Sequence, residues 1–200
     1  VSAFIGILMG IWMATSKQLA VKNTLLGIAT LGVSIPGFVT AILLMMVFGV
    51  WWPVLPIVGL GSPANYILPV AAQSFGQIAS IARLTKSTYS EAIQMDYVTM
   101  ARAKGLSNLY ITVRHVLKNA LIPVVTYFGP AIAFLITGSF VVESIFSIPG
   151  IGREFTNAIT NRDYTVVLGF SVFIGVIITV ANLAVDIICS LIDPRIKLTN

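Results

Sequence analysis

The chain has 200 residues, of which 57% are hydrophobic and only 10% are charged. An ordinary soluble domain is about 45–50% apolar and about 25% charged, so this composition excludes a soluble globular protein and predicts a membrane protein. The net charge of +5 does not indicate nucleic-acid binding, because the basic residues lie between apolar segments and form no stripe alternating with aromatic residues.

The first apolar segment, residues 1–15, is shorter than a membrane span. A helix of this length measures about 22 Å, whereas the hydrocarbon core of a bilayer is about 30 Å thick. The segment lacks the basic region and the cleavage site of a signal peptide, and no initiator Met precedes it. We therefore expect the chain to be a truncated piece of a longer protein, with at least one further span upstream.

Four longer apolar segments follow, at residues 24–50, 66–82, 120–142 and 164–191. No charged residue occurs between Lys22 and Arg83, a run long enough for two spans. Kinks are expected at four prolines within or at the ends of these spans, namely Pro36, Pro69, Pro123 and Pro130. The pattern predicts an all-α, polytopic transmembrane helical bundle in one domain, 1–200, with five spans present.

The distribution of basic residues predicts the orientation. If the loop 83–118 is cytoplasmic, ten basic residues lie inside, including Lys17, Lys22, Arg195 and Lys197. Only Arg153 and Arg162 then lie outside, in the outer loop 143–163. The positive-inside rule therefore predicts a cytoplasmic C-terminus.

Polar residues within the spans indicate either a pathway or contacts between helices. Gln73, Gln77 and Ser80 are spaced i, i+4 and i+7, so they share one helical face. This face is a candidate pathway lining, and interhelical hydrogen bonding explains it equally well. In the last span, Asn182 and Asp186 lie near the inner end, where interhelical hydrogen bonding is favoured.

The loop 83–118 predicts two helices joined by a sharp corner. The first helix carries an apolar stripe formed by Ile93, Tyr97, Met100 and Ala101. Arg102 and Lys104 suit the last turn of that helix, and Gly105 is placed to end it. Ser107 is placed to cap the next helix, with Leu106 and Ile111 spaced for a hydrophobic staple.

A rigid knob of this kind favours docking into a groove on a soluble partner. The alternative is adsorption to anionic lipid, which the six basic and two acidic residues of the loop would suit. Lipid adsorption requires no corner with caps on both sides, so docking is the preferred interpretation.

The outer segment has an apolar stripe at Ile151, Phe155 and Ile159, flanked by charged residues. The sequence PGIG at 149–152 lacks the Lys of a phosphate-binding loop and is interpreted as a turn. The stripe predicts a short helix that lies in the plane of the membrane interface with its charges outward.

Five motifs in succession carry a resemblance to a known family: DYVTMARAKGL, RHVLKNALIPVVT, VVESIFSIPGIG, NRDY and DPRIK. In this order they resemble the inner-membrane permease subunit of binding-protein-dependent ABC importers, specifically the B-type subunit of the oligopeptide, dipeptide and nickel group. The resemblance implies a MetI-like permease fold in the bacterial inner membrane. At the three positions of the family's Glu-Ala-Ala triplet, only Ala101 matches.

The resemblance also implies roles for the loops. A short coupling helix, about 99–110, would dock on a cytoplasmic ATPase, and the residues of this coupling loop are Asp96, Tyr97, Thr99, Ala101, Arg102, Ala103, Lys104, Gly105 and Leu106. By the same resemblance the outer segment would lie beside the translocation path, either as a re-entrant plug or as a docking site for the binding protein. The outer gate, or the side facing the binding protein, would contain Glu143, Pro149, Gly150, Gly152, Arg162 and Asp163.

The implied partners are a second permease subunit, two ATP-binding subunits, an extracytoplasmic substrate-binding protein and membrane lipid. Peptides are the expected cargo. The chain itself is expected to be non-catalytic and to hold no cofactor or metal, with ATP and Mg bound by the partner subunits.

The residues disfavour two other classes of protein. A hydrolase is disfavoured because the only His, His115, lies at the predicted cytoplasmic surface, far from candidate nucleophiles such as Ser139. A lone Cys, Cys189, and one His do not make a metal site, so Cys189 is expected to be a buried apolar residue. An ion-coupled carrier or channel is the remaining alternative, disfavoured by the absence of a clear midplane charge.

Overall fold

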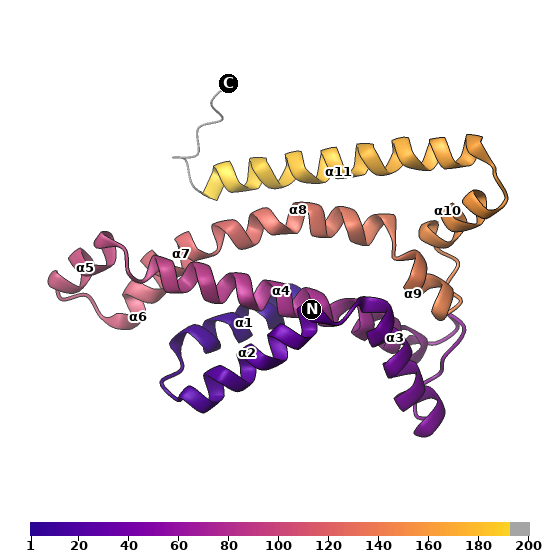
Figure 1. The fold of residues 1–200 in the computed structure, drawn as a ribbon. Coiled ribbons are helices and arrows are strands. Elements are labelled where there is room, and N and C mark those ends of the chain that lie inside the picture. Colours follow the sequence, from indigo (N-terminus) through magenta and orange to yellow (C-terminus); the bar gives the residue numbers. More distant parts are fainter. Residues whose placement is uncertain (193–200) are drawn as a thin grey trace. The chain divides into compact units, whose positions relative to one another are not determined.

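The computed structural model describes residues 1–192, and this part of the chain contains helices and turns without a strand (Figure 1). The predicted all-α fold is confirmed. The whole motif DPRIK at 193–197, with the two basic residues Arg195 and Lys197, lies outside the described residues.

The helices are named in chain order. The first half of the chain forms α1 (Ser2–Thr15), α2 (Leu19–Ser34), α3 (Gly37–Met45), η1 (Met46–Trp51), η2 (Pro63–Tyr66) and α4 (Ile67–Ala92). The second half forms α5 (Asp96–Ala103), α6 (Asn108–Ile111), η3 (Thr112–Val116), α7 (Leu117–Ala120), α8 (Ile122–Thr137), α9 (Phe140–Ile145), α10 (Ile151–Thr160) and α11 (Tyr164–Ile192).

The chain divides into two compact units. The first contains residues 1–34, 77–128 and the chain from 185 onward, and the second contains 35–76 and 129–184. The boundaries fall inside α4, α8 and α11, so the two ends of each of these helices belong to different units.

In the first unit, α1 packs closely on α4 through two glycines one turn apart. A methyl group added at Gly6 would lie 2.8 Å from Ile81 Cβ, and one added at Gly10 would lie 2.6 Å from the Ala82 carbonyl oxygen. Small residues at this spacing let two helix backbones approach closely, which is a common way to pack helices in lipid. Figure 1 shows α1 and α2 as a hairpin. The hairpin and α4 share a core that consists of Met13, Ala29, Ala79 and Ala82.

In the second unit, α3 and the first turns of α4 pack with α9. The buried side chains of this core are Ala41, Leu68, Ala72, Val142 and Phe146. The helix α9 is also in contact with α10, so the core extends towards the outer segment.

The second predicted span is interrupted. The helix ends at Ser34 and a new one begins at Gly37, with Pro36 at the N-cap position. A proline disfavours helical geometry at the preceding residue and lacks an N–H group, so the expected kink at Pro36 is confirmed as a complete break. By contrast, Pro130 lies inside α8, which continues through it.

Two helices in the described part are long and apolar enough to cross a membrane, Ile122–Ile145 and Tyr164–Leu191. The number rises to three if the broken pair Leu19–Ser34 and Gly37–Trp51 is one span. The five spans remain a prediction. The helix α4 continues ten residues past the expected end of its span, to Ala92, and this last part has a mostly polar sequence.

The contact between α1 and α4 leads to a test of stability. A Gly10→Val substitution places a branched side chain where even a methyl group would lie 2.5 Å from Thr85 Cβ. We expect this overpacking to lower the free energy of unfolding by about 1–3 kcal/mol. The measurement is the thermal unfolding midpoint of the purified protein in detergent. Gly27→Val is the matched control, since no atom lies within 4 Å of a methyl group at that glycine; equal losses for the two variants would contradict the close contact.

Candidate functional site

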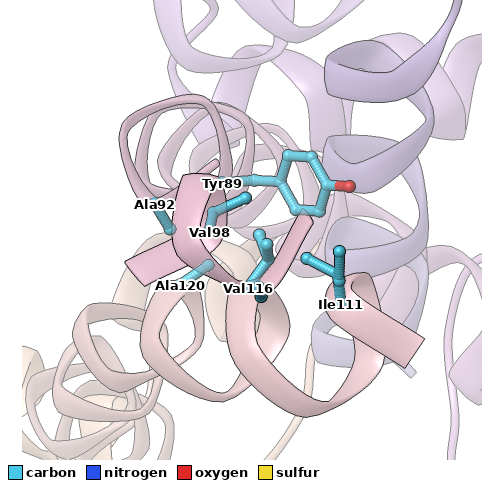
Figure 2. Close-up of a cluster of buried hydrophobic side chains, with 7 residues drawn as sticks. Tyr89, Ala92, Val98, Ile111, Val116 and Ala120 are labelled. Atoms are coloured by element: carbon cyan, nitrogen blue, oxygen red, sulfur yellow. The ribbon is translucent and has the colours of Figure 1, made fainter. Parts of the chain in front are cut away.

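The candidate site is the helical corner between α4 and α8. We call residues 96–111 the elbow; it consists of α5, the turn 104–107 and α6. A small apolar cluster holds the elbow against the end of α4, and Figure 2 shows its side chains pointing towards one another. The buried members are Tyr89, Ala92, Val98, Ala101, Ile111, Val116 and Ala120.

The cluster draws on every helix from α4 to α7. Val98 and Val116 are fully buried at its centre, and Tyr89 reaches them from α4 with only 2% of its surface exposed. Interiors of this kind are close-packed and transmit displacement with little compression. The elbow is therefore a rigid extension of α4 and not a flexible connection.

The corner itself is a Schellman motif centred on Gly105. The N–H of Leu106 donates to the carbonyl of Ala101 at 3.3 Å, and the N–H of Gly105 donates to the carbonyl of Arg102 at 2.9 Å. Gly105 has φ +76°, the left-handed region that residues with a Cβ rarely adopt. The predicted helix end at Gly105 is confirmed.

The following helix begins as predicted. The Ser107 hydroxyl accepts a hydrogen bond from the Tyr110 N–H at 3.3 Å, which is the N-cap contact of α6. Ile111 is buried in the cluster, whereas Leu106 is 39% exposed and is not a member of it. The caps on both sides of the corner are therefore present, while the predicted staple leaves Leu106 largely outside the core.

The predicted apolar stripe of the first helix is wrong in one respect. Ile93, Tyr97 and Ala101 pack in or against the cluster, but Met100 is 60% exposed and Val98 takes the central place. The cause is that α4 continues to Ala92, so Ile93 lies in the turn before α5 and does not set the phase of that helix.

The predicted coupling helix 99–110 is also not continuous, because α5 ends at Ala103 and α6 begins at Asn108. Most residues of the predicted coupling loop lie on the surface of this region. Those exposed are Asp96, Thr99, Arg102, Ala103, Lys104, Gly105 and Leu106. Tyr97 is partly buried, and Ala101 faces the core.

The exposed surface of the elbow and the helix after it combines large apolar side chains with cations. Leu109 is 75% exposed and Val113 is 58% exposed, and the partly apolar surface also includes Met95, Met100 and Tyr110. Arg102, Lys104, Arg114 and Lys118 are exposed in the same segment. Apolar side chains that gather on a surface beside charges are typical of a protein interface.

His115 lies in the short π-helix η3, and its ring packs edge-to-face on Tyr110 with centroids 5.9 Å apart. This contact joins His115 to a neighbouring aromatic side chain of the same segment. The wider turn of a π-helix is frequent at functional sites. No pattern in the sequence predicts it.

The candidate pathway residues on α4 are each partly buried. The Tyr127 hydroxyl of α8 donates to Gln77 Oε1 at 2.9 Å, a contact between residues 50 apart in the chain. This hydrogen bond agrees with the alternative that Gln77 serves in bonding between helices. Tyr127 itself was missed, because a lone Tyr in an apolar span carries no signal.

In the last helix, Asn182 is partly buried and Asp186 is exposed within this single chain. Cys189 is buried, as predicted, and its Sγ lies 3.4 Å from Thr126 Oγ1.

The outer segment places most of its candidate residues around the start of α10. Gly150 is the N-cap of this helix, Gly152 is buried in its first turn, and the partly buried Glu143 of α9 accepts a hydrogen bond from the Arg153 N–H at 2.8 Å. The predicted turn at 149–152 is wrong in its position: the turn lies at Phe146 and Ser147, and Ile151 and Gly152 already belong to α10. Asp163 accepts from the Val166 N–H at 3.1 Å and so caps α11.

The apolar stripe of α10, like that of α5, is only partly packed against other residues. Phe155 packs edge-to-face on Phe170 of α11, with centroids 5.9 Å apart, whereas Ile159 is 53% exposed. Arg162 and Pro149 are both exposed, and Arg162 adopts φ +57° in the turn before α11.

Comparisons with known proteins agree with the fold. Residues 6–198 match the family described as binding-protein-dependent transport system inner membrane component. In the solved structures, a chain from the crystal structure of an amino acid ABC transporter with histidines matches with a TM-score of 0.64, covering 98% of this chain and 87% of that one. Sequence identity is 19%, so this likeness shows the fold alone.

Curated relatives are closer in sequence. The chain is 43% identical to the dipeptide transport system permease protein DppB of Bacillus subtilis, over 96% of this chain and 63% of the relative. It is 41% identical to the oligopeptide transport system permease protein OppB of Salmonella typhimurium, over 98% of this chain and 65% of the relative. The chain thus spans a little under two thirds of the length of these relatives. The chain belongs to the family of binding-protein-dependent transport system inner membrane components.

Proposed function

We propose that this chain is the non-catalytic permease subunit of an ATP-driven peptide importer. The observation that carries the proposal is the elbow, which is rigidly attached to α4 and presents exposed apolar and basic side chains. Family membership and relatives named as dipeptide and oligopeptide permeases support the class of cargo.

The elbow can transmit force because its core is short and closed. A soluble ATPase that held Met100 and Leu109 in a groove would move the capped corner as one body. The corner would then displace α4, which contributes Tyr89 and Ala92 to the cluster that holds it. It would also displace the start of α8, because α7 belongs to the same cluster and leads directly into α8. Two bistable arrangements of such helices would open the pathway alternately to each side.

The proposed assembly contains a second permease subunit, two cytoplasmic ATP-binding subunits and an extracytoplasmic binding protein. ATP hydrolysis takes place in the ATP-binding subunits, and the chain carries no glycine-rich loop followed by Lys and Ser or Thr. The elbow and the C-terminus lie on the cytoplasmic side of the inner membrane, and the segment 143–163 lies outside. ATP-dependent uptake of a labelled dipeptide by the reconstituted complex tests this proposal; equal uptake without nucleotide would favour an ion-coupled carrier.

The corner is tested by Gly105→Pro. Proline cannot adopt φ +76°, so the corner loses its geometry. Proline also has no N–H to donate to the carbonyl of Arg102, so the corner loses a hydrogen bond that contributes about 1 kcal/mol. We expect peptide uptake to fall to background while ATP hydrolysis continues. Uptake and hydrolysis are measured in proteoliposomes. Gly105→Asn is the control, since Asn tolerates the left-handed region and should retain most uptake; normal uptake by the proline variant would refute the role of the corner.

Substitutions at two neighbouring residues of the elbow distinguish docking on an ATPase from adsorption to lipid. Leu109→Asp and Asn108→Asp each add one negative charge at an exposed position, but only the first removes an apolar side chain. If the surface docks on an ATPase, Leu109→Asp should reduce co-purification of the ATPase at least about tenfold, as for a buried interface anchor, and Asn108→Asp should change it little. Equal effects of the two variants would indicate that charge alone matters and would favour lipid adsorption.

The role of Gln77 is tested by comparing two substitutions that affect the same hydrogen bond. Tyr127→Phe removes the donor and should cost roughly 0.6 kcal/mol, the average for such bonds in membranes. If Gln77 also lines the pathway, Gln77→Lys should impair uptake without loss of assembly, and Tyr127→Phe should leave uptake nearly normal. Normal uptake by Gln77→Lys would leave interhelical bonding as the role of Gln77.

A further inference from the structure

The carboxylate of Glu143 lies in a niche that three glycines leave open. A methyl group added at Gly138 or Gly150 would overlap the carboxylate, and one added at Gly152 would lie 3.1 Å from Glu143 Oε2 and 2.8 Å from the Phe140 backbone nitrogen. The backbone therefore closes on this side chain from two loops and from the first turn of α10.

The niche is also the start of a helix that lacks its own cap. Gly150 occupies the N-cap position of α10 and offers no side-chain acceptor for the free N–H groups of the first turn. Arg153 is the third residue of α10, and its N–H is a group that an N-cap Ser or Asp serves in other helices. Here that N–H donates to Glu143 Oε2 at 2.8 Å, across ten residues of sequence.

The charge and the place of Glu143 suit this contact. An anion near a helix N-terminus is stabilised by the helix dipole as well as by the hydrogen bond. Glu143 is partly buried, so water screens the contact less than it would on an open surface. The glycines explain how a carboxylate can approach so closely, because any side chain at these positions would exclude it.

The middle of the same helix is attached to α11. Phe155 in α10 packs on Phe170 in α11, and Asp163 caps α11 directly after the intervening turn. The helix α10 therefore connects α9, through Glu143, to α11, through Phe155.

We propose that Glu143 is a positioning residue that caps α10 from α9, and that Gly138, Gly150 and Gly152 form its receptor. Glu143 thereby holds α9, α10 and the first turns of α11 as one rigid body. The inference goes beyond the proposed function, because it concerns the cap itself and holds whatever the assembly transports.

Hydrogen–deuterium exchange of the full-length protein, in its purified assembly and in lipid nanodiscs, tests the cap directly. Glu143→Ala should speed exchange in the first turn of α10 by about fivefold to tenfold, the effect expected for loss of a helix cap. Exchange in α4 and in the elbow should not change. A uniform increase across the protein would show a general structural role and would overturn the proposal.

The matched control is Glu154→Gln, which removes a negative charge from the first turn of the same helix without touching the niche. Glu143→Gln keeps the size of the side chain and should increase exchange by an intermediate amount. If Glu143→Ala fails to assemble, the exchange rates of Glu143→Gln and Glu154→Gln in the first turn of α10 are compared instead to test the cap. Equal exchange in the two glutamine variants would mean that only the dipole is involved, and the proposed cap would be refuted.

The receptor is tested by a double-mutant cycle. Gly150 has φ −115°, an ordinary conformation for alanine, so Gly150→Ala should destabilise the protein only through its overlap with the carboxylate. We expect Gly150→Ala to lower the unfolding midpoint when Glu143 is present and to have almost no effect in the Glu143→Ala background. Additive effects would show that the glycine and the carboxylate act independently.

Discussion

The structure depends on how each helix end satisfies its backbone hydrogen-bonding groups. The first N–H groups and the last carbonyl groups of a helix have no partner within it, so each helix end needs a local arrangement that supplies one. The backbone groups at the helix ends find different kinds of partner at different corners of the chain. Gly105 closes α5 through two backbone bonds, Ser107 opens α6 with its hydroxyl, and Asp163 opens α11 with its carboxylate. At α10 the same requirement is met from a distance, by Glu143.

Close approach between backbones is the second constraint. Apolar side chains gain little by leaving lipid, so van der Waals contact and hydrogen bonds between helices dominate association. Gly6 and Gly10 let α1 lie against α4, and the fully buried Thr85 is directly under Gly10. The Tyr127 hydroxyl then adds a polar contact between α4 and α8. Each contact needs a small or polar residue at one position and tolerates most apolar residues around it.

These two constraints meet in the elbow. Its core consists largely of alanine and valine, so α5 and η3 pack close to α4. Its caps leave few ways for the corner to bend, and the larger apolar residues Met100, Leu109 and Val113 are left on the surface. A segment that is rigid inside and apolar outside has the properties that a mechanical link between a membrane helix and a soluble motor requires.

The sequence alone determined the properties that depend on near neighbours. Apolar composition and the scarcity of charge predicted an all-α membrane protein, and the positions of Gly105 and Ser107 predicted the corner, because helix caps involve residues only a few positions apart. The order of the motifs also indicated the family. The same local chemistry predicted a kink at Pro36. It did not predict that the helix breaks completely there.

Only the tertiary structure decided which faces pack. Where α4 ends sets the phase of α5, and this places Val98 inside and Met100 outside although both are apolar. The partners Gln77 and Tyr127 are 50 residues apart, and Glu143 caps a helix ten residues away with the help of Gly138, a glycine that no local pattern distinguishes. The reason is physical: backbone preferences and caps act over a few residues, whereas a contact between distant residues exists only once packing has brought them together.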